Sequence, residues 1–295
     1  MESKTSALVD FASGVCAGVA NVIVCAPLDT ARTRLQTQNI YEKKYNGIIS
    51  ALSKTYREEG LKSLYQGLNA SIIAYPSSWS IYFMLYNRIR SYFGDLFHND
   101  TLGNVAGASI AGLTGSIITN PLWLIRARMQ VQSGHSKYTS VADSLRLIIK
   151  EEGFFALFNG CKASMLGTIH VVVQFPLYEL TKKLIKREYE PPHILEMILC
   201  TIFPKFVASL CSYPHEVLRA RLFMSQKDTD QMFTGLWSLM KYTWQNEGIK
   251  GFYSGFSVNL LRVMPSTFVT LYTYEHVSYF LSTHKIADYI GLKRL

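Results

Sequence analysis

Apolar and polar stretches alternate along this chain, and six of the apolar stretches approach the length of a membrane-spanning helix. They cover residues 8–26, 68–86, 105–120, 163–178, 194–213 and 256–274. About 20 apolar residues are needed to cross the hydrocarbon core of a bilayer. Because a backbone in lipid must satisfy its own hydrogen bonds, we expect each stretch to be helical. The pattern therefore predicts an all-α membrane protein with six transmembrane helices.

A ten-residue motif after every second apolar stretch recurs at a nearly constant interval. It begins at Pro27, Pro121 and Pro214, and each copy carries basic residues five and seven positions after the proline. An amphipathic segment and a Glu-Gly pair follow each copy, at 59–60, 152–153 and 247–248. Two linked motifs with one period indicate an internal repeat. We divide the chain into repeats at 1–98, 99–190 and 191–295, related by pseudo-threefold symmetry.

The prolines and the charges that follow them predict a constriction. A proline inside a helix removes one backbone hydrogen bond and kinks the helix. Three kinks at one depth would draw the helices together at one end. Charges in a membrane are costly unless they face water or one another, so we expect the acids and bases after the prolines to form a ring there. Glycine pairs at Gly14 and Gly18, and at Gly103 and Gly107, predict close helix packing.

Composition changes this picture only in part. The 295-residue chain has a formal net charge of +9, and 17% of its residues are charged, against roughly 25% in soluble proteins. Its mean hydropathy of +0.10 is low for a bundle buried in lipid, which polar loops and a wet interior would explain. A basic balance suits anionic lipids, anionic solutes or nucleic acid. Since no Lys/Arg run or nucleic-acid motif is present, we expect no nucleic-acid partner.

The sequence lacks the motifs of an enzyme. It has no Gly-x-Gly-x-x-Gly fingerprint after a strand, no P-loop, and no Ser/His/Asp or metal-spaced cluster. We therefore expect neither a catalytic site nor a metal site. The five cysteines are odd in number and lack paired spacing, which predicts reduced thiols rather than a disulfide framework.

The motif Pro-x-acid-x-x-base-x-base-x-Gln, followed by acid-Gly, resembles the signature of the mitochondrial carrier family over residues 8–281. The resemblance implies six transmembrane helices around a water-filled cavity, three short matrix-side amphipathic helices, and alternating access between two gates. It also implies a multi-pass protein of the mitochondrial inner membrane, or of a peroxisomal or plastid membrane. It implies no cofactor, cardiolipin as a structural lipid, and a monomer, because the repeats close their own ring.

The same resemblance implies a matrix gate of charged residues braced by glutamines. Its members are Asp29, Arg32, Gln36, Arg126, Gln130, Glu216 and Arg219. Asp29 would pair with Arg126 and Glu216 with Arg32. Arg219 would meet Trp123, which replaces the usual acid.

The resemblance also implies a cytoplasmic gate, built from aromatic-acid-x-x-base motifs on the second, fourth and sixth predicted helices. Its members are Asn87, Arg90, Glu179, Lys182 and Glu275. Glu275 with Arg90 would be an ion pair, whereas Asn87 with Lys182 would be a hydrogen bond. We therefore expect a weaker outer gate.

Three segments resemble the branch of the family that carries NAD, FAD, folate and pyrimidine nucleotides. They are residues 79–83, 121–123 and 170–179, of which the last is most similar to NAD carriers. The resemblance implies exchange of NAD+, with adenine nucleotides as counter-substrate. FAD or folate, or pyrimidine nucleotides, are the alternatives. Other hypotheses are a non-transporting receptor of the same fold and a proton or fatty-acid uncoupler.

Candidate substrate contacts suit an anionic, aromatic solute. They are Trp79, Trp123, Gly167, Thr168, His170, Gln174, Lys205 and Arg262. Arg262 and Lys205 would together neutralise a diphosphate, while Trp79 or Trp123 would stack on a ring. A structural ion pair for Arg262, a snorkelling lysine, and packing roles for Trp79 and His170 are the competing interpretations.

Overall fold

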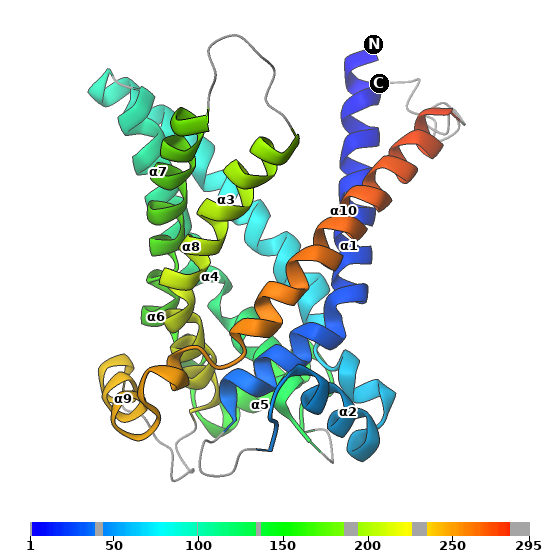
Figure 1. Ribbon diagram of the computed structural model, residues 1–295, viewed down its shortest axis with the longest axis vertical. Coiled ribbons are helices and arrows are strands. Elements are labelled where there is room, and N and C mark those ends of the chain that lie inside the picture. The colour runs from blue at the N-terminus through cyan, green and yellow to red at the C-terminus, as the bar shows by residue number, and fades with distance from the viewer. Residues whose placement is uncertain are drawn as a thin grey trace.

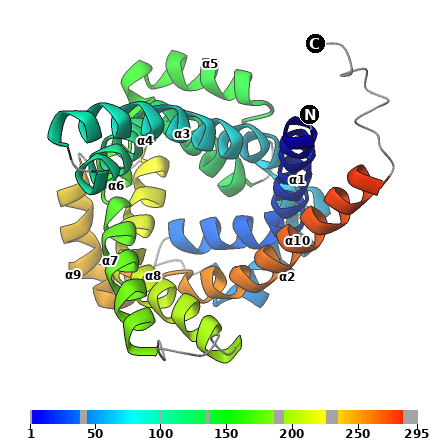
Figure 2. The same cartoon turned by 90° about the horizontal axis from the view of Figure 1, so that it is seen from above.

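The computed structural model describes residues 2–38, 44–98, 100–133, 137–185, 194–225 and 235–283. Its long helices are α1 (Glu2–Thr37), α3 (Leu68–Phe97), α4 (Asp100–Val131), α7 (Thr168–Ile185), α8 (Ile194–Met224) and α10 (Phe256–Thr283). Figure 1 shows that these helices converge toward one end of the molecule and diverge toward the end where α1 begins. Seen along that direction, they form a ring (Figure 2).

Shorter helices lie at the end where the long helices converge. They are α2 (Ile48–Glu59), α5 (Val141–Glu151) and α9 (Leu236–Phe252), with 3-10 turns η1 (Leu61–Tyr65) and η2 (Phe154–Phe158) after the first two. Figure 1 shows α2, α5 and α9 grouped at that end, across the direction of the long helices. They are the three short amphipathic helices that the sequence predicts, and we call their side of the molecule the matrix side.

The three motif prolines lie inside helices, as predicted. Pro27 is within α1, Pro121 within α4 and Pro214 within α8. Because proline has no backbone N–H, Pro214 cannot donate to the carbonyl of Leu210, four residues before it. The Tyr253 hydroxyl donates to that carbonyl instead, at 3.1 Å. The prolines therefore bend the helices without ending them.

Apolarity alone does not identify every spanning helix. Among the described helices, Val9–Thr37 and Ala106–Val131 pass a simple test of length and hydropathy, with mean values of 1.9 and 1.3. The sequence prediction of six spans depends on the repeat as much as on hydropathy, because helices that line a polar cavity carry polar and charged residues on one face.

The two glycine pairs have different environments. A Cβ atom at Gly103 would lie 2.7 Å from the Arg90 carbonyl oxygen, and one at Gly107 would lie 3.1 Å from the Arg90 Cβ. These glycines allow α4 to approach α3 closely, as predicted. The prediction is wrong for Gly14 and Gly18, where a Cβ would meet no atom within 4 Å.

The fourth spanning segment is not one continuous helix. Helix α6 (Cys161–Met165) ends before Gly167, and α7 begins after it. The Gly167 amide donates to the Ser164 carbonyl and the His170 amide donates to the Gly167 carbonyl, both across three residues. Such i→i+3 bonds tighten the turn into 3-10 geometry. The apolar pattern over 163–178 predicts no such break.

Candidate functional site

A polar cavity of about 240 Å3 lies between α1, α4 and α8, near the end where they converge. Its lining includes Asp29, Arg32, Trp123, Arg126, Glu216 and Arg219. All six follow a motif proline, so the three kinked helices bring them to one depth. The ring of charges that the sequence predicts at a constriction is therefore present.

Two ion pairs join neighbouring repeats in this ring. The Arg126 Nη2 atom lies 2.8 Å from Asp29 Oδ2, and the Arg126 Nε donates to Ser71 Oγ at 2.8 Å. Arg32 Nη2 pairs with Glu216 Oε2. These are the two pairs that the resemblance implies for the matrix gate. They connect α1 to α4 and α8 to α1.

The third position of the ring has an aromatic contact in place of an ion pair. The Arg219 guanidinium carbon lies 5.6 Å from the centre of the Trp123 ring and 5.1 Å from that of Phe223. The Arg126 guanidinium carbon also lies near this ring, 5.2 Å from its centre. Among the described residues, Arg219 forms no ion pair. A tryptophan face attracts such cations, so Trp123 is in contact with two arginines.

Arg262 forms an ion pair rather than lying beside Lys205. Its Nε is 2.7 Å from Asp29 Oδ1, and its Nη2 donates to the Tyr75 hydroxyl at 3.3 Å. Asp29 therefore binds two arginines, one from α4 and one from α10. Two carboxylates and four guanidinium groups then meet at the floor of the cavity, which leaves a net positive charge.

In the described part of the chain, the two gate glutamines form no side-chain hydrogen bond with the ion pairs that they were expected to brace. Gln36 Nε2 donates to the Tyr213 hydroxyl at 3.0 Å, and Gln130 Oε1 accepts from Thr33 Oγ1 at 2.8 Å. Both bonds cross from one repeat to another. The glutamines therefore join repeats beside the ion pairs.

Lys205 lies higher in the molecule than the charged floor. It is exposed and precedes Glu216 on α8 by 11 residues, or about three helical turns, so the two share one face of the helix. At a rise of about 1.5 Å per residue this separates their backbones by roughly 16 Å. In this structure Lys205 and Arg262 would meet different parts of one solute.

The remaining candidate contacts are separate from the charged floor. Trp79 is 59% exposed and stacks on Phe83 with ring centres 5.6 Å apart. His170 Nδ1 is within hydrogen-bond distance of Ser212 Oγ, at 3.1 Å, which is the packing role that competed with substrate contact. A Cβ at Gly167 would lie 3.3 Å from the His215 ring.

The last two candidate contacts, Gln174 and Thr168, are also on helix α7. Gln174 is half-buried on the same helix as His170. The side chain of Thr168 lies outside the described residues.

The residues predicted to form the cytoplasmic gate are unpaired where the structure describes them. Asn87, Arg90 and Glu275 are exposed, and no ion pair joins Glu275 to Arg90 in the described part of the chain. The side chains of Glu179 and Lys182 lie outside that part. Among the described residues, the predicted matrix gate is thus paired, and the predicted cytoplasmic gate is not.

A second layer of ion pairs lies below the first and was not predicted. Arg34 pairs with Glu59, Arg128 with Glu152 and Arg221 with Glu247, within repeats 1, 2 and 3 respectively. All six side chains are no more than 10% exposed. The sequence contained the signal, because the second basic residue of the motif and the Glu-Gly pair recur together three times.

Comparison with known proteins agrees with this architecture. A family model described as mitochondrial carrier protein matches residues 3–96, 97–189 and 190–285. The mitochondrial nicotinamide adenine dinucleotide transporter 1 of Saccharomyces cerevisiae is 35% identical over 278 residues, covering 90% of this chain and 74% of the relative.

Two further relatives cover more of their own length. The chloroplastic nicotinamide adenine dinucleotide transporter 1 of Arabidopsis thaliana is 33% identical over 295 residues, covering 96% of this chain and 95% of the relative. The mitochondrial pyrimidine nucleotide transporter of S. cerevisiae is 30% identical over 325 residues, covering 93% and 86%. With three matches of the family model along nearly its whole length, this chain belongs to the mitochondrial carrier family.

Proposed function

We propose that this protein exchanges NAD+ for an adenine nucleotide across the mitochondrial inner membrane by alternating access. The observation that carries the proposal is the cavity floor, where four arginines outnumber two carboxylates around a tryptophan. A site of this kind suits a solute with phosphate groups and an aromatic ring. The names of the two nicotinamide adenine dinucleotide transporters support the choice of NAD+ within that class.

Arg219 and Trp123 are the first contacts that such a solute would meet at the floor. Arg219 has no carboxylate partner among the described residues, so a phosphate would not have to displace one. The cavity volume of about 240 Å3 is below the roughly 300–1,000 Å3 of ordinary ligand pockets. The floor would therefore hold one end of a dinucleotide, and the other end would extend toward Lys205.

Arg262 connects substrate binding with opening of the matrix gate. A phosphate that drew Arg262 away from Asp29 would remove one of the two cations on that carboxylate. The ion pair that joins α10 to α1 would then be lost, and Asp29 would keep Arg126 as its one ion-pair partner among the described residues. A ligand shifts a conformational equilibrium only through such a difference in affinity between the two states, so the empty carrier would remain closed.

Lipid, assembly and location belong to the same proposal. We expect cardiolipin as a structural lipid and a monomer as the working unit. The relatives are named as mitochondrial and chloroplastic proteins, so a plastid membrane is the alternative location, and a peroxisomal membrane was also considered.

Uptake of labelled NAD+ into liposomes tests the function. The liposomes contain purified protein and are preloaded with AMP, ADP, FAD, folate, UTP or buffer. Saturable uptake that requires an internal nucleotide is the expected result. Uptake of UTP or folate with no uptake of NAD+ would show that the substrate is one of those solutes. The pyrimidine nucleotide relative favours UTP among those alternatives.

A double variant tests the site. Lys205→Ala with Arg262→Ala should abolish exchange, because both cations expected to meet phosphate are removed. Lys241→Ala is the matched control, since Lys241 is an exposed lysine on α9 and does not line the cavity. Exchange at the unaltered rate by the double variant would refute the proposed contacts.

A further inference from the structure

The lower layer of arginines does more than pair with its own glutamates. Arg34, Arg128 and Arg221 each lie two residues after a gate arginine, and their side chains are only 2%, 2% and 8% exposed. Each one uses two nitrogen atoms on a glutamate of its own repeat. The third nitrogen, Nε, points to a different repeat in every case.

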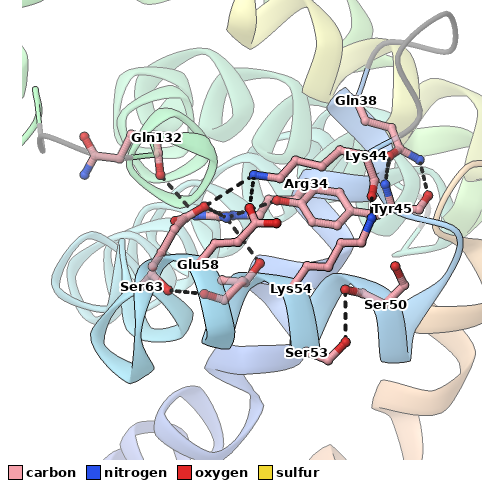
Figure 3. Close-up of polar contacts among 12 residues, drawn as sticks. Arg34, Gln38, Lys44, Tyr45, Ser50, Ser53, Lys54, Glu58, Ser63 and Gln132 are labelled. Carbon is pink, nitrogen blue, oxygen red and sulfur yellow. Dashed lines mark hydrogen bonds and ion pairs between the residues drawn. The ribbon is translucent and has the colours of Figure 1, made fainter.

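Arg34 illustrates the arrangement, and Figure 3 shows this side chain among its polar neighbours, with Gln132 on one side and Tyr45 on the other. Its Nη1 and Nη2 atoms lie 2.6 and 2.7 Å from the two carboxylate oxygens of Glu59. Its Nε donates to the backbone carbonyl of Gln130 at 3.0 Å, and Nη2 also donates to that of Gln132 at 3.0 Å. Both carbonyls belong to the end of α4 and the residue just after it. One guanidinium therefore ties repeat 1 to repeat 2.

The other two arginines repeat this geometry in sequence. Arg128 Nε donates to the Phe223 carbonyl on α8 at 2.8 Å. Arg221 Nε donates to the Gln36 carbonyl on α1 at 3.0 Å. The direction is α1 to α4, α4 to α8, and α8 back to α1, so the three bonds close a ring.

We propose that Arg34, Arg128 and Arg221 form a second matrix lock below the ion pairs of the matrix gate. Arg128 closes the seam, or line of contact, between α4 and α8, where the matrix gate has no ion pair. This inference rests on the proposed alternating access. The bonds to glutamate stay within a repeat and persist when repeats separate. The Nε bonds to carbonyls cross between repeats and must break for the matrix end to open.

The three seams, α1–α4, α4–α8 and α8–α1, differ in whether an ion pair also joins their two helices. Asp29–Arg126 also joins α1 to α4, and Glu216–Arg32 also joins α8 to α1. Between α4 and α8, the described residues contain no ion pair, and Arg219 of α8 meets the Trp123 ring of α4 instead. Arg128 is thus the positioning residue on which that seam depends most.

Lysine substitution separates the two functions of each arginine. A lysine keeps the charge opposite the glutamate, but its single nitrogen cannot also form the guanidinium fork that reaches the carbonyl. A hydrogen bond from a charged donor shifts an equilibrium by roughly tenfold to a hundredfold. Arg128→Lys should therefore favour the matrix-open state more than Arg34→Lys does.

Opening is measured with a cysteine reporter. Ala220, which lines the cavity and is 8% exposed, is replaced by cysteine in a protein whose five native cysteines are serines. A membrane-impermeant maleimide is applied from the matrix side, without substrate. We expect labelling to be about tenfold faster or more in Arg128→Lys, and less affected in Arg34→Lys. Lys137→Gln, which breaks an exposed ion pair to Glu151 within repeat 2, should leave it unchanged.

A rescue variant keeps the test decisive if Arg128→Lys is unstable. Adding Trp123→Asp places an acid opposite Arg219 across the same seam, so it should restore slow labelling. Equal labelling of Arg128→Lys and Arg34→Lys, or no rescue, would overturn the inference. Because no substrate is present, a failure of NAD+ uptake would refute the proposed transport and leave this result standing.

Discussion

Replacing Trp123 by aspartate should strengthen the matrix gate and slow transport. The new carboxylate would face Arg219, whose guanidinium carbon is now 5.6 Å from the centre of the tryptophan ring. At that separation and an effective dielectric constant of about 20, the attraction is about 3 kcal/mol. Loss of the aromatic contact costs about 1–2 kcal/mol. The net gain of about 1–2 kcal/mol corresponds to roughly five- to thirtyfold slower opening.

Trp123→Asn is the matched control for this prediction. Asparagine has nearly the same shape as aspartate, so both variants lose the ring and leave the same space. The rate of exchange in liposomes and the melting temperature in detergent are measured for both. We expect the aspartate variant to exchange more slowly and to melt at a higher temperature than the asparagine variant. Identical rates and melting temperatures would show that Arg219 does not take part in the gate.

Three other predictions follow from particular contacts. Gly103→Ala should lower the melting temperature, because its Cβ would lie 2.7 Å from a backbone oxygen, whereas Gly14→Ala should leave it unchanged; similar melting of both contradicts this packing. Tyr213→Phe removes a hydroxyl that accepts from one repeat and donates to Ser254, and should cost about 1 kcal/mol of stability by chemical denaturation. Glu275→Gln should reduce exchange more than Glu179→Gln, and equal losses would refute the weaker outer gate.

The structural features that arise from the threefold repeat of the sequence were predicted most completely. Three prolines at one period placed three bends, and the charges after them placed the Asp29–Arg126 and Glu216–Arg32 pairs. The expectation of a carrier rather than an enzyme is confirmed by the family match. In each case a pattern along the chain determined the result, because symmetry fixes which positions meet.

Features that depend on a single neighbour were not predicted. The position of Arg262 on its helix gave its depth, but not that Asp29 would hold it. The spacing of Gly14 and Gly18 matched that of Gly103 and Gly107, yet in the described structure only the second pair lies within 4 Å of atoms of another helix. Local spacing describes one helix surface, and the opposing surface comes from residues far away in the chain.

The lower arginine ring also bears on how the chain folds. The Nε of Arg34 finds its acceptor at Gln130, in the next repeat. A single repeat cut from the chain would keep the pair with Glu59 but would lack that acceptor, and water would have to take its place. No repeat is complete on its own, and the last returns to the first through Gln36. The smallest unit that satisfies its own hydrogen bonds is therefore the whole set of three.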